Sequence, residues 1–509
     1  MPKTFYITTA IPYANGDPHI GFAMEAVMTD TIARYKRLMG FDVYFMTGTD
    51  ENGTKNYETA EKEGIPIEQF VDRQSKRFQA LTPLLHLTND DFIRTTDQKR
   101  HWPACQKLWR KLEEKGDIYK KEYEGLYCSG CEKFVTGRDL NEKGECPDHK
   151  RKPTLLKEEN YFFKLSRYSG QIAELLESNA LQIIPEFRKN EILTMAKEGL
   201  HDVSFSRPRN VLPWGVPVPG DDTHVMYVWC DALTNYISAL DYAHEGKLYQ
   251  KYWAAKGAVT LHVIGKDITR FHAGIWIGML LSAGVPLPKA ELVHGFVSHN
   301  GEKMSKSLGN VVDPKDVIDR YGLDALRYYL LREIPLGQDG DFNDALFTER
   351  YNSDLANNLG NLVNRVHTLV TRNGITDFFF DHGHKLYQEE VDKTWKKYGT
   401  SMDQYGFSEA IFHVWKLVDF ANRQMEKEKP WEAMRSAPEK GSATLCNLLE
   451  VIRHISILIS PFIPGTSAKI REQLGLPAEI DREGEQGWGA VTPWTKLGKA
   501  SIIFPRIEV

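Results

Sequence analysis

The sequence predicts an α/β protein in which an inserted segment splits a parallel sheet and an all-α domain follows. A strand, a helix and a second strand open the chain, and another buried-strand pattern returns at residues 259–264. A cysteine-rich segment lies between these patterns, and helical periods dominate after residue 352. We therefore expect two halves of a sheet domain at 1–113 and 227–291, an insertion at 114–226, a linker at 292–351 and a helical domain at 352–509.

The first fifty residues carry the clearest of these patterns. Residues 4–9 are rich in β-branched and aromatic side chains, and a loop of Pro, Asn, Gly and Asp follows them up to His19. Apolar side chains then recur every three or four positions up to Met39, and Gly40 stands where a helix would stop. Residues 43–46 predict a short buried strand that ends in Thr-Gly-Thr-Asp. A strand, a helix and a strand in this order favour parallel strands, whose carboxyl ends are where open α/β sheets bind ligands.

The later segments are assigned from the same periodicities. Residues 259–264 predict a second buried strand, and residues 268–283 have helical character. The proline-rich stretch 207–220 is typical of a connecting loop rather than of the core of a sheet. Helical periods extend to about residue 474 and predict a C-terminal helix bundle.

Composition limits the class of protein. A chain of 509 residues with 41% hydrophobic content can bury the cores of several domains. Its formal net charge of -5 means that any nucleic acid must be bound by local basic patches. Six cysteines are too few for a disulfide framework, and no segment approaches the roughly eighteen consecutive apolar residues of a membrane span. We expect neither a signal peptide nor a membrane span, and a cytoplasmic location.

Four soft or borderline ligands form a candidate metal site in the insertion. Cys128 and Cys131 make one pair with a two-residue spacer, and Cys146 and His149 make a second pair fourteen residues later. The alternative is a set of reduced core cysteines, but Cys128 and Cys131 stand among Ser, Gly, Glu and Lys rather than among apolar residues. Four protein ligands fill a tetrahedral shell, so we expect one structural zinc ion. Three cysteines are isolated and are expected to pack in the core: Cys105, Cys230 and Cys446.

Two short motifs predict a nucleotide site. His19 belongs to Pro-His-Ile-Gly at the start of the first predicted helix, and Lys303 and Lys306 belong to Lys-Met-Ser-Lys-Ser in a loop flanked by glycines. Each motif alone has an ordinary explanation, because a histidine near a helix start is commonly structural and lysines in polar loops are commonly solvated. Their joint occurrence on either side of a split α/β sheet resembles the two signatures of class I aminoacyl-tRNA synthetases.

The resemblance implies that a carboxylate attacks the α-phosphate of ATP, with magnesium accompanying the nucleotide. Charge then develops on phosphate oxygens, which need preorganised positive partners. His19, beside the free N–H groups of a helix N-terminus, would supply such a partner, and Gly21 would let the nucleotide approach the backbone. Lys303, Ser305 and Lys306 would bind the triphosphate on a mobile loop.

Among class I enzymes the chain is most similar to those for methionine, from Tyr6 to about Leu474. The resemblance implies that Asp50 binds the ammonium group of methionine, and that Gly265 and Asp267 bind the nucleoside of ATP. It assigns the rest of the methionine site to Ile11, Tyr13, Trp229, Ala232, Leu233, Tyr236, His272, Ile275 and Trp276. Aromatic walls suit a polarisable thioether, although the tryptophans alone would be interpreted as core residues.

The chain departs from the family pattern at two positions. Phe22 stands where the first signature normally has a second histidine, and phenylalanine cannot donate a hydrogen bond. The loss of such a donor would cost about 2 to 4 kcal/mol of transition-state stabilisation. Asn52 stands two residues after Asp50, where the family usually has a histidine.

The helical domain is expected to bind the anticodon of tRNA(Met). Asn361 and Arg365 are four residues apart, hence on one helix face, and Trp431 follows a proline downstream. The family uses matching residues to read unstacked anticodon bases, which proteins recognise by stacking and by hydrogen bonds to base edges. From pattern alone, a core role for Trp431 is equally reasonable. Because the chain ends soon after the bundle, we expect a monomer.

The expected activity is the ATP-dependent activation of L-methionine to methionyl-adenylate and its transfer to tRNA(Met). Isoleucine, valine and leucine enzymes carry a larger editing insertion than the residues available here, and cysteine enzymes use zinc ligands scattered along the chain. One alternative is a related nucleotidyltransferase that adenylates a small metabolite, which the C-terminal bundle disfavours. Another is a tRNA-binding paralogue with a decayed ATP site, which Phe22 favours and Asp50, Lys303 and Lys306 disfavour.

Overall fold

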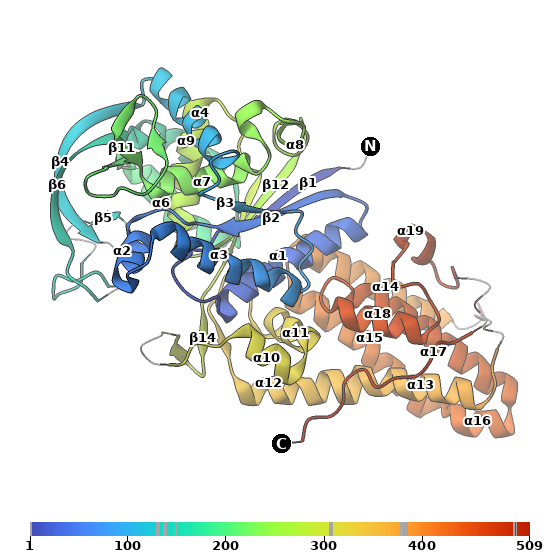
Figure 1. The fold of residues 1–509 in the computed structure, drawn as a ribbon. Coiled ribbons are helices and arrows are strands. Elements are labelled where there is room, and N and C mark those ends of the chain that lie inside the picture. Colours follow the sequence, from blue (N-terminus) through green and yellow to red (C-terminus); the bar gives the residue numbers. More distant parts are fainter. Residues whose placement is uncertain are drawn as a thin grey trace. The chain divides into compact units, whose positions relative to one another are not determined.

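The chain forms two compact units (Figure 1). The computed structural model describes residues 3–128, 133–135, 140–147, 150–304, 309–376, 378, 385–491, 494 and 496–508. Unit 1 consists of Met1–Pro18 and Phe41–Gly295, and unit 2 consists of His19–Gly40 and Phe296–Val509.

A six-stranded parallel sheet is the centre of unit 1. Its order is β3-β2-β1-β12-β13-β7, and every neighbouring pair is parallel. The strands are β1 (Thr4–Thr9), β2 (Asp42–Thr49), β3 (Asp91–Arg94), β7 (Gln182–Ile184), β12 (Val259–Gly265) and β13 (Ala290–His294). The sheet therefore confirms the predicted α/β class, with β1 and β12 adjacent although about 250 residues separate them in the chain.

One face of this sheet carries the main core of unit 1. Tyr6, Met46 and Ile264 point into a buried cluster that also contains Trp109 and Trp276. Helices α4 (His101–Glu114), α7 (Val228–Ser238) and α9 (Ile277–Ala283) and the π-helix η6 (Phe271–Trp276) supply much of that cluster. The other helical segments are α2 (Thr54–Glu63), α3 (Ile67–Leu84), η4 (Tyr242–His244), α8 (Lys247–Tyr249) and η5 (Gln250–Ala254).

The inserted segment has sheets of its own. A four-stranded antiparallel sheet has the order β5-β4-β6-β8, and a three-stranded antiparallel sheet has the order β10-β11-β9. The elements are β4 (Ile118–Cys128), β5 (Lys133–Val135), β6 (Thr154–Phe163), η2 (Leu165–Tyr168), α5 (Ser169–Glu177), η3 (Glu186–Arg188), α6 (Lys189–Glu198), β8 (Val203–Ser204), β9 (Ser206–Pro208), β10 (Pro217–Val218) and β11 (Asp221–Met226).

Two features of this segment differ from the sequence-based expectation. The stretch 207–220, expected to be a loop, contains parts of β9 and all of β10. Both are edge strands, where proline is tolerated because no ladder hydrogen bond from its nitrogen is required. In addition, β7 lies within the expected insertion but pairs with β13 of the main sheet. A strand of three residues is too short to give a periodic signal.

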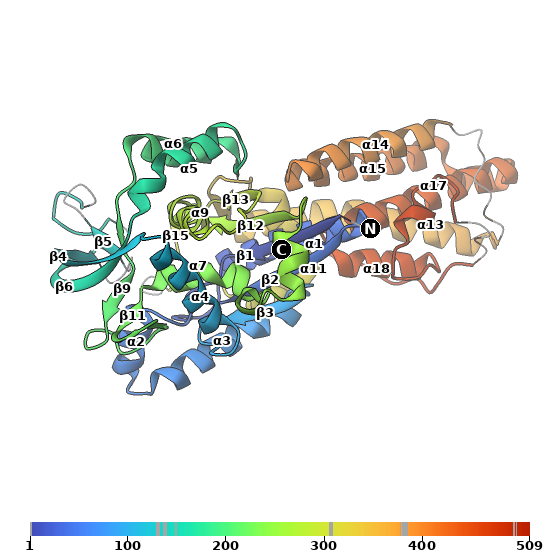
Figure 2. The same ribbon diagram turned by 90° about the horizontal axis from the view of Figure 1, so that it is seen from above.

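Unit 2 contains a small sheet and the helical bundle. The sheet has the order β15-β14-β16, from β14 (Val297–His299), β15 (Glu302–Lys303) and β16 (Gly340–Phe342). The helices are α1 (Ile20–Leu38), α10 (Pro314–Tyr321), α11 (Leu323–Glu333), α12 (Asp344–Arg350), η8 (Tyr351–Gly360), α13 (Asn361–Arg372), α14 (Lys385–Asp403), α15 (Phe407–Glu428), α16 (Pro430–Ser436), α17 (Pro438–Ile459), α18 (Pro464–Gln473) and α19 (Arg482–Glu485). Helix α14 packs along α15, and α17 contacts α13, α15 and α18 (Figure 2), which confirms the predicted helical region.

Helix α1 belongs to unit 2, although it connects β1 to β2 along the chain. The buried carboxylate of Asp30 on α1 forms an ion pair with Arg327 on α11, 2.8 Å from Nη2 to Oδ2. Arg327 also donates from Nε to the carbonyl oxygen of Phe462 at 2.7 Å. A buried charge pair with additional hydrogen bonds is costly to separate, so these contacts fix α1 against α11 and the start of α18.

Helix α17 is the most apolar long helix of the described chain. It is the one helix there that is long and apolar enough to cross a membrane by length and composition. Its apolar window is 89% buried inside the protein, as in the core helix of a folded domain.

Candidate functional site

His19 caps the N-terminus of α1. Its backbone is extended, with φ -134° and ψ 174°, and its Nδ1 atom accepts a hydrogen bond of 3.1 Å from the N–H of Gly21. In a neutral ring the proton therefore lies on Nε2, which is a donor. A Cβ atom at Gly21 would lie 2.9 Å from Cε1 and 3.0 Å from Nδ1 of His19. Gly21 thus makes room for the histidine ring, a role that the sequence did not suggest.

The next backbone N–H groups of α1 are also hydrogen-bonded. Ile20 donates to the carbonyl oxygen of Val312 at 3.0 Å, and Phe22 and Ala23 donate to that of His19 at 3.0 and 3.1 Å. The expectation of free N–H groups at this helix N-terminus is therefore wrong. The donor on His19 Nε2 and the helix dipole are what this turn offers an anion. Because Phe22 adds no donor, the lysines of the loop gain importance.

The segment with the Lys-Met-Ser-Lys-Ser motif, residues 303–307, is called the lysine loop. Its first residue, Lys303, is exposed and lies on β15. Its carbonyl oxygen accepts a hydrogen bond of 3.2 Å from the side-chain amide of Asn310, and the carbonyl oxygen of Asn310 lies 3.0 Å from His299 Nδ1. Ser305 and Lys306 lie outside the described residues. Since Ile20 is bonded to Val312, two residues beyond Asn310, the structure brings the first turn of α1 next to the segment that closes this loop.

In unit 1, Tyr13 and Asp50 lie side by side at the end of β2. They form a parallel β-bridge, in which Ala14 donates to the Asp50 carbonyl oxygen at 2.8 Å and Asp50 donates to that of Pro12 at 2.9 Å. The Asp50 side chain is 5% exposed, and the Thr95 hydroxyl donates to its Oδ1 at 3.4 Å. The structure thus places a nearly buried carboxylate at the end of β2, next to the backbone of Tyr13.

Helices α7 and η6 bring together the aromatic residues predicted for the side-chain pocket. Trp229 stacks on Phe271, with ring centroids 3.9 Å apart, and Tyr236 and Trp276 are 5.9 Å apart. The hydroxyl of Tyr236 lies 2.7 Å from Nε2 of His272. Trp229 is partly exposed, whereas Ala232, Leu233, Ile275 and Trp276 are buried.

The protonation of His272 follows from its two contacts. Nδ1 donates to the carbonyl oxygen of Ile268 at 3.0 Å, so Nε2 of the neutral ring accepts from the Tyr236 hydroxyl. Burial lowers the pKa of His272 to about 4, although the bond to Ile268 opposes this shift. The pocket wall therefore carries a neutral imidazole, which suits an uncharged thioether.

Two residues behind this wall were missed from the sequence. Nδ1 of His262 on β12 lies 2.9 Å from the Thr8 hydroxyl, and its ring stacks on Tyr236 with centroids 4.0 Å apart. Phe271 was missed as the partner of Trp229. A histidine within a buried strand is an unusual polar residue for a core, and this signal could have identified His262.

The turn after β12 contains the predicted nucleoside-binding residues. The backbone N–H of Lys266 donates to the carbonyl oxygen of His294 at 3.0 Å. A Cβ atom at Gly265 would lie 2.7 Å from Oδ1 of Asp267. Gly265 therefore allows the Asp267 carboxylate to lie against the strand end, where parallel sheets bind ligands.

The structure describes two of the four candidate metal ligands. Cys128 ends β4, Cys146 forms a bridge with Arg151, and both thiols are buried in one small cluster with Val135. Cys131 and His149 lie outside the described residues, and within the part of the chain that is described no three His, Cys, Asp or Glu side chains form a metal-binding group. The isolated cysteines Cys105, Cys230 and Cys446 are buried, as predicted.

The predicted anticodon residues Arg365 and Trp431 lie together in unit 2. The guanidinium of Arg365 is 5.5 Å from the centroid of the Trp431 ring, and its Nη1 lies 2.7 Å from Oε1 of Glu426. Asn361 is exposed one turn before Arg365 on α13. Trp431 is only partly buried, so it is available as a stacking surface.

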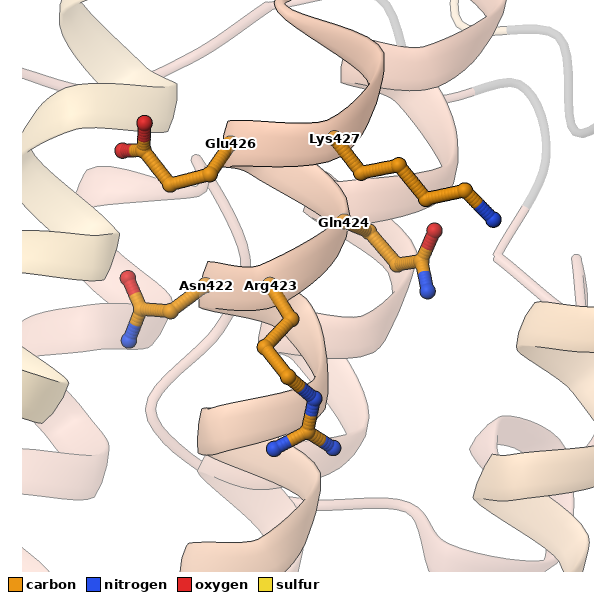
Figure 3. A pocket seen from close by; sticks show the side chains of 5 residues that line it. All are labelled: Asn422, Arg423, Gln424, Glu426 and Lys427. Carbon is orange, nitrogen blue, oxygen red and sulfur yellow. The ribbon is translucent and has the colours of Figure 1, made fainter.

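A hollow of about 720 Å³ adjoins this group on α15. Figure 3 shows Asn422 and Glu426 pointing to one side of the helix, and Gln424 and Lys427 to the other. The side-chain amide of Asn422 donates to Oδ1 of Asn358 at 2.7 Å. The hollow is lined by Asn422, Arg423, Gln424, Glu426 and Lys427. Its amides and cations can bond to base edges and phosphates.

Comparisons with known proteins agree with both units. The family described as tRNA synthetases class I (M) matches residues 5–152 and 148–367, and the anticodon binding domain of methionyl tRNA ligase matches residues 380–508. The methionine–tRNA ligase of Caldanaerobacter subterraneus is 43% identical over 100% of this chain and 80% of that protein. The Brucella suis enzyme is 40% identical over 99% of this chain and 98% of the relative.

A solved structure extends this similarity to the fold. Mycobacterium tuberculosis methionyl-tRNA synthetase, in complex with methionyl-adenylate, superposes with a TM-score of 0.93 and 37% identity, covering 99% of this chain and 100% of that one. At this level of identity and coverage, fold and family are shared. The chain therefore belongs to the methionine–tRNA ligases, a family of class I tRNA synthetases.

Proposed function

We propose that this methionine–tRNA ligase activates L-methionine with ATP through the residues described above and then esterifies tRNA(Met). The observation that carries the assignment is the joint presence of the nearly buried Asp50 carboxylate and the aromatic wall on α7 and η6. In the first step a methionine carboxylate oxygen bonds to the α-phosphorus of ATP, and the bond from that phosphorus to pyrophosphate breaks. In the second step a ribose hydroxyl of the terminal tRNA adenosine attacks the acyl carbon and AMP leaves.

Unit 1 supplies the groups that bind methionine. The Asp50 carboxylate accepts hydrogen bonds from the ammonium group, which are charge-assisted and strong because Asp50 is nearly buried. The rings of Trp229 and Tyr236 contact the thioether, and each sulfur–ring contact contributes about 0.3 to 1.5 kcal/mol. Neutral His272 fixes the Tyr236 hydroxyl by accepting its hydrogen bond. Ile11, Tyr13, Ala232, Leu233, Ile275 and Trp276 complete the proposed pocket.

Unit 2 supplies the groups that bind the phosphates. Nε2–H of His19 donates to a phosphate oxygen near the positive end of the α1 dipole. Lys303 and Lys306 neutralise the charge that develops as pyrophosphate leaves, and Ser305 donates a hydrogen bond. Magnesium accompanies ATP in the proposed reaction. Gly265 and Asp267 of unit 1 bind the nucleoside.

Pyrophosphate exchange against the twenty amino acids tests this assignment. Methionine-dependent exchange is expected, whereas exchange with another amino acid would contradict the specificity, and no exchange would favour a tRNA-binding paralogue. Lys306→Ala should lower the exchange rate with little change in methionine affinity, because the lysine binds phosphate rather than methionine. Equal losses of exchange rate and of methionine affinity would contradict the phosphate-binding role of Lys306.

We also propose that Cys128, Cys131, Cys146 and His149 hold one structural zinc ion. The support is their paired spacing and the common burial of the two described thiols in one cluster. Zinc would fix the end of β4 to the segment around Cys146. Metal analysis of the purified protein should give about one zinc per chain, and Cys128→Ser should reduce it, whereas Cys446→Ser, at an isolated buried cysteine, should retain it. Full zinc content in the Cys128 variant would contradict the proposal.

The helical unit is proposed to bind the anticodon of tRNA(Met) through Asn361, Arg365 and Trp431. The close approach of Arg365 to Trp431 supports this role, because a stacking ring and a planar donor together suit an unstacked base. We further propose a cytoplasmic monomer. Sedimentation equilibrium with and without tRNA tests the oligomeric state.

A further inference from the structure

The side chain of Asn52 connects two parts of unit 1 through buried hydrogen bonds. Its Nδ2 atom donates to Oδ2 of Asp231 on α7 at 3.1 Å and to the carbonyl oxygen of Thr95 at 3.2 Å. Asn52 is 1% exposed and Asp231 is 0% exposed. Because both side chains are buried, water cannot replace this hydrogen bond, and its loss would leave a buried acceptor without this donor.

Each end of the connection lies beside one part of the proposed methionine site. Asn52 is two residues after Asp50, and the amide of Asn56 donates to the carbonyl oxygens of both, at 3.2 and 3.3 Å. Thr95 donates to the Asp50 carboxylate and accepts the Glu51 N–H at 2.8 Å. The segment after β2 that carries Asp50 is thus held by bonds to Thr95 and Asn56, both of which also bond to Asn52.

Asp231 lies on the helix that carries the side-chain wall. It lies on α7 away from the face of Trp229 and Tyr236, so a shift of Asp231 can change the position of these rings only by moving the helix as a whole. Nε2 of His101 lies 3.9 Å from Oδ1 of Asp231, and Cys105 donates to the Asp231 carbonyl oxygen at 3.8 Å. Burial lowers the pKa of His101 to about 3, so this neighbour is neutral. The bond from Asn52 is therefore a specific link between β2 and α7.

We propose that Asn52 and Asp231 are positioning residues that fix the distance between the ammonium-binding Asp50 and the side-chain wall on α7, and thereby the length of amino acid accepted. This inference rests on the proposed assignment of Asp50 and α7 to methionine binding. A pocket discriminates one methylene by only about 10- to 200-fold, so a small change in this distance alters selectivity. Both would act by positioning Asp50 and α7, not by binding the amino acid.

The residue type at position 52 determines how many hydrogen bonds it can donate to its buried neighbours. Histidine is usual there in the family, yet this chain uses an amide whose two hydrogens reach both Asp231 and Thr95. Alanine would leave the buried Asp231 carboxylate without this donor. Histidine, which has a ring donor, would restore a bond to Asp231.

Exchange kinetics with methionine and with ethionine, which is one methylene longer, test the proposal. Asn52→Ala should raise KM for methionine about 10-fold, as expected for the loss of a buried hydrogen bond, with a smaller change in kcat. It should also reduce the preference for methionine over ethionine by about 5-fold or more. Asn52→His should restore most of the methionine affinity and most of the preference for methionine over ethionine. The matched control is Thr234→Val on the same helix, because the Thr234 hydroxyl donates to Cys230 and does not reach β2.

A charged variant at position 52 tests the link between Asn52 and Asp231 independently. Asn52→Asp places two carboxylates about 3 Å apart, so one of them keeps a proton and its pKa rises. KM for methionine should then be higher at pH 8 than at pH 6, whereas the wild type should show no comparable rise. An unchanged methionine preference in Asn52→Ala, or equal effects of Thr234→Val, would overturn the inference. Absence of methionine-dependent exchange in the wild type would instead refute the proposed function.

Discussion

The backbone N–H of Ile20 donates to the carbonyl oxygen of Val312 at 3.0 Å, which joins the first turn of α1 to the segment that follows the lysine loop. Asn310, two residues before Val312, holds the base of the same loop through the carbonyl oxygen of Lys303. The histidine signature and the lysine signature are therefore connected by backbone and side-chain hydrogen bonds within unit 2. This connection would let the two signatures, almost three hundred residues apart in the chain, act on one substrate as proposed.

Asn310→Ala should impair the chemical step selectively. Without the bond to Lys303 the loop base loses its fixed position, and misplacement of a phosphate-binding group costs about 10- to 100-fold in kcat of pyrophosphate exchange. KM for ATP should rise, and KM for methionine should stay unchanged. Lys315→Ala is the control, because it removes an exposed cation, paired with Asp319, from nearby helix α10. A larger effect of Lys315→Ala would refute the role of Asn310.

Gly21→Ala should displace His19. The new Cβ atom would lie 2.9 Å from the histidine ring, closer than carbon atoms pack, so the ring must rotate and lose its bond to the Gly21 N–H. Loss of one preorganised donor costs about 100-fold in kcat. The exchange rate and the thermal unfolding temperature are measured together, with Gly170→Ala, where no atom lies within 4 Å of the added Cβ, as control. A near-normal kcat in Gly21→Ala would contradict this prediction, because it would mean that displacing the His19 ring does not impair the reaction.

Most of the fold could be predicted from periodicity. The first strand and the start and end of α1 agree with expectation, because buried strands and amphipathic helices leave long regular patterns. β7 could not be found, because three residues give no pattern, and its pairing with β13 depends on distant sequence. The edge strands β9 and β10 were hidden by prolines that a central strand would exclude.

The candidate site was predictable in its residue types but not in its contacts. The motifs identified His19, Asp50 and Trp229, yet sequence could not reveal that hydrogen bonds already engage the first N–H groups of α1. Those bonds depend on the position of Val312, which accepts from Ile20, and on the orientation of the His19 ring, which accepts from Gly21. Likewise, Asn52 was recognised only as a departure from the family, and its bond to Asp231 required the structure.

Acid should destabilise unit 1 below pH 6.5 because of its buried histidines. Burial lowers the pKa of His272 to about 4 and that of His101 to about 3. Between these values and 6.5, the unfolded chain binds protons that the folded chain does not, so the free energy of unfolding falls as pH falls. Each histidine costs about 2 kcal/mol at pH 5. The unfolding temperature at pH 7 and pH 5 tests this, and His101→Gln should reduce the difference. An unfolding temperature that is the same at pH 7 and pH 5 would contradict the lowered pKa values of these histidines.

Trp431→Ala should separate aminoacylation from activation. A stacked base contributes about 1 to 3 kcal/mol, so kcat/KM for tRNA should fall roughly 5- to 150-fold. Methionine-dependent pyrophosphate exchange without tRNA should stay unchanged. Trp431→Phe should keep part of the stacking, and Phe412→Ala, which removes an exposed ring from α15, is the control. Equal losses in both assays would indicate a folding role for Trp431 instead.

Arg453→Met should destabilise the helical bundle strongly. Arg453 and Glu450 on α17 are both fully buried and form two hydrogen bonds, Nε to Oε2 at 2.8 Å and Nη2 to Oε1 at 2.6 Å. Burial alone raises the pKa of Glu450, but the bonds from Arg453 and His454 outweigh it and lower the pKa to about 2. The variant leaves a buried carboxylate without its partner, which costs about 3 to 5 kcal/mol.

The double variant Arg453→Met, Glu450→Gln is the matched control for this pair. It removes both charges, so it should be more stable than Arg453→Met alone even though it carries one more substitution. Denaturant unfolding followed by tryptophan fluorescence is informative here, because Trp488 stacks on His454, which neighbours Arg453. Glu450 has its lowered pKa only in the folded state with Arg453, so the wild type should gain stability as pH rises from about 2 to about 4.5 and keep it above. A double variant less stable than the single one would contradict this expectation and mean that the Glu450 carboxylate is stabilised chiefly by its other partners, the N–H of Gly489 at 2.7 Å and His454.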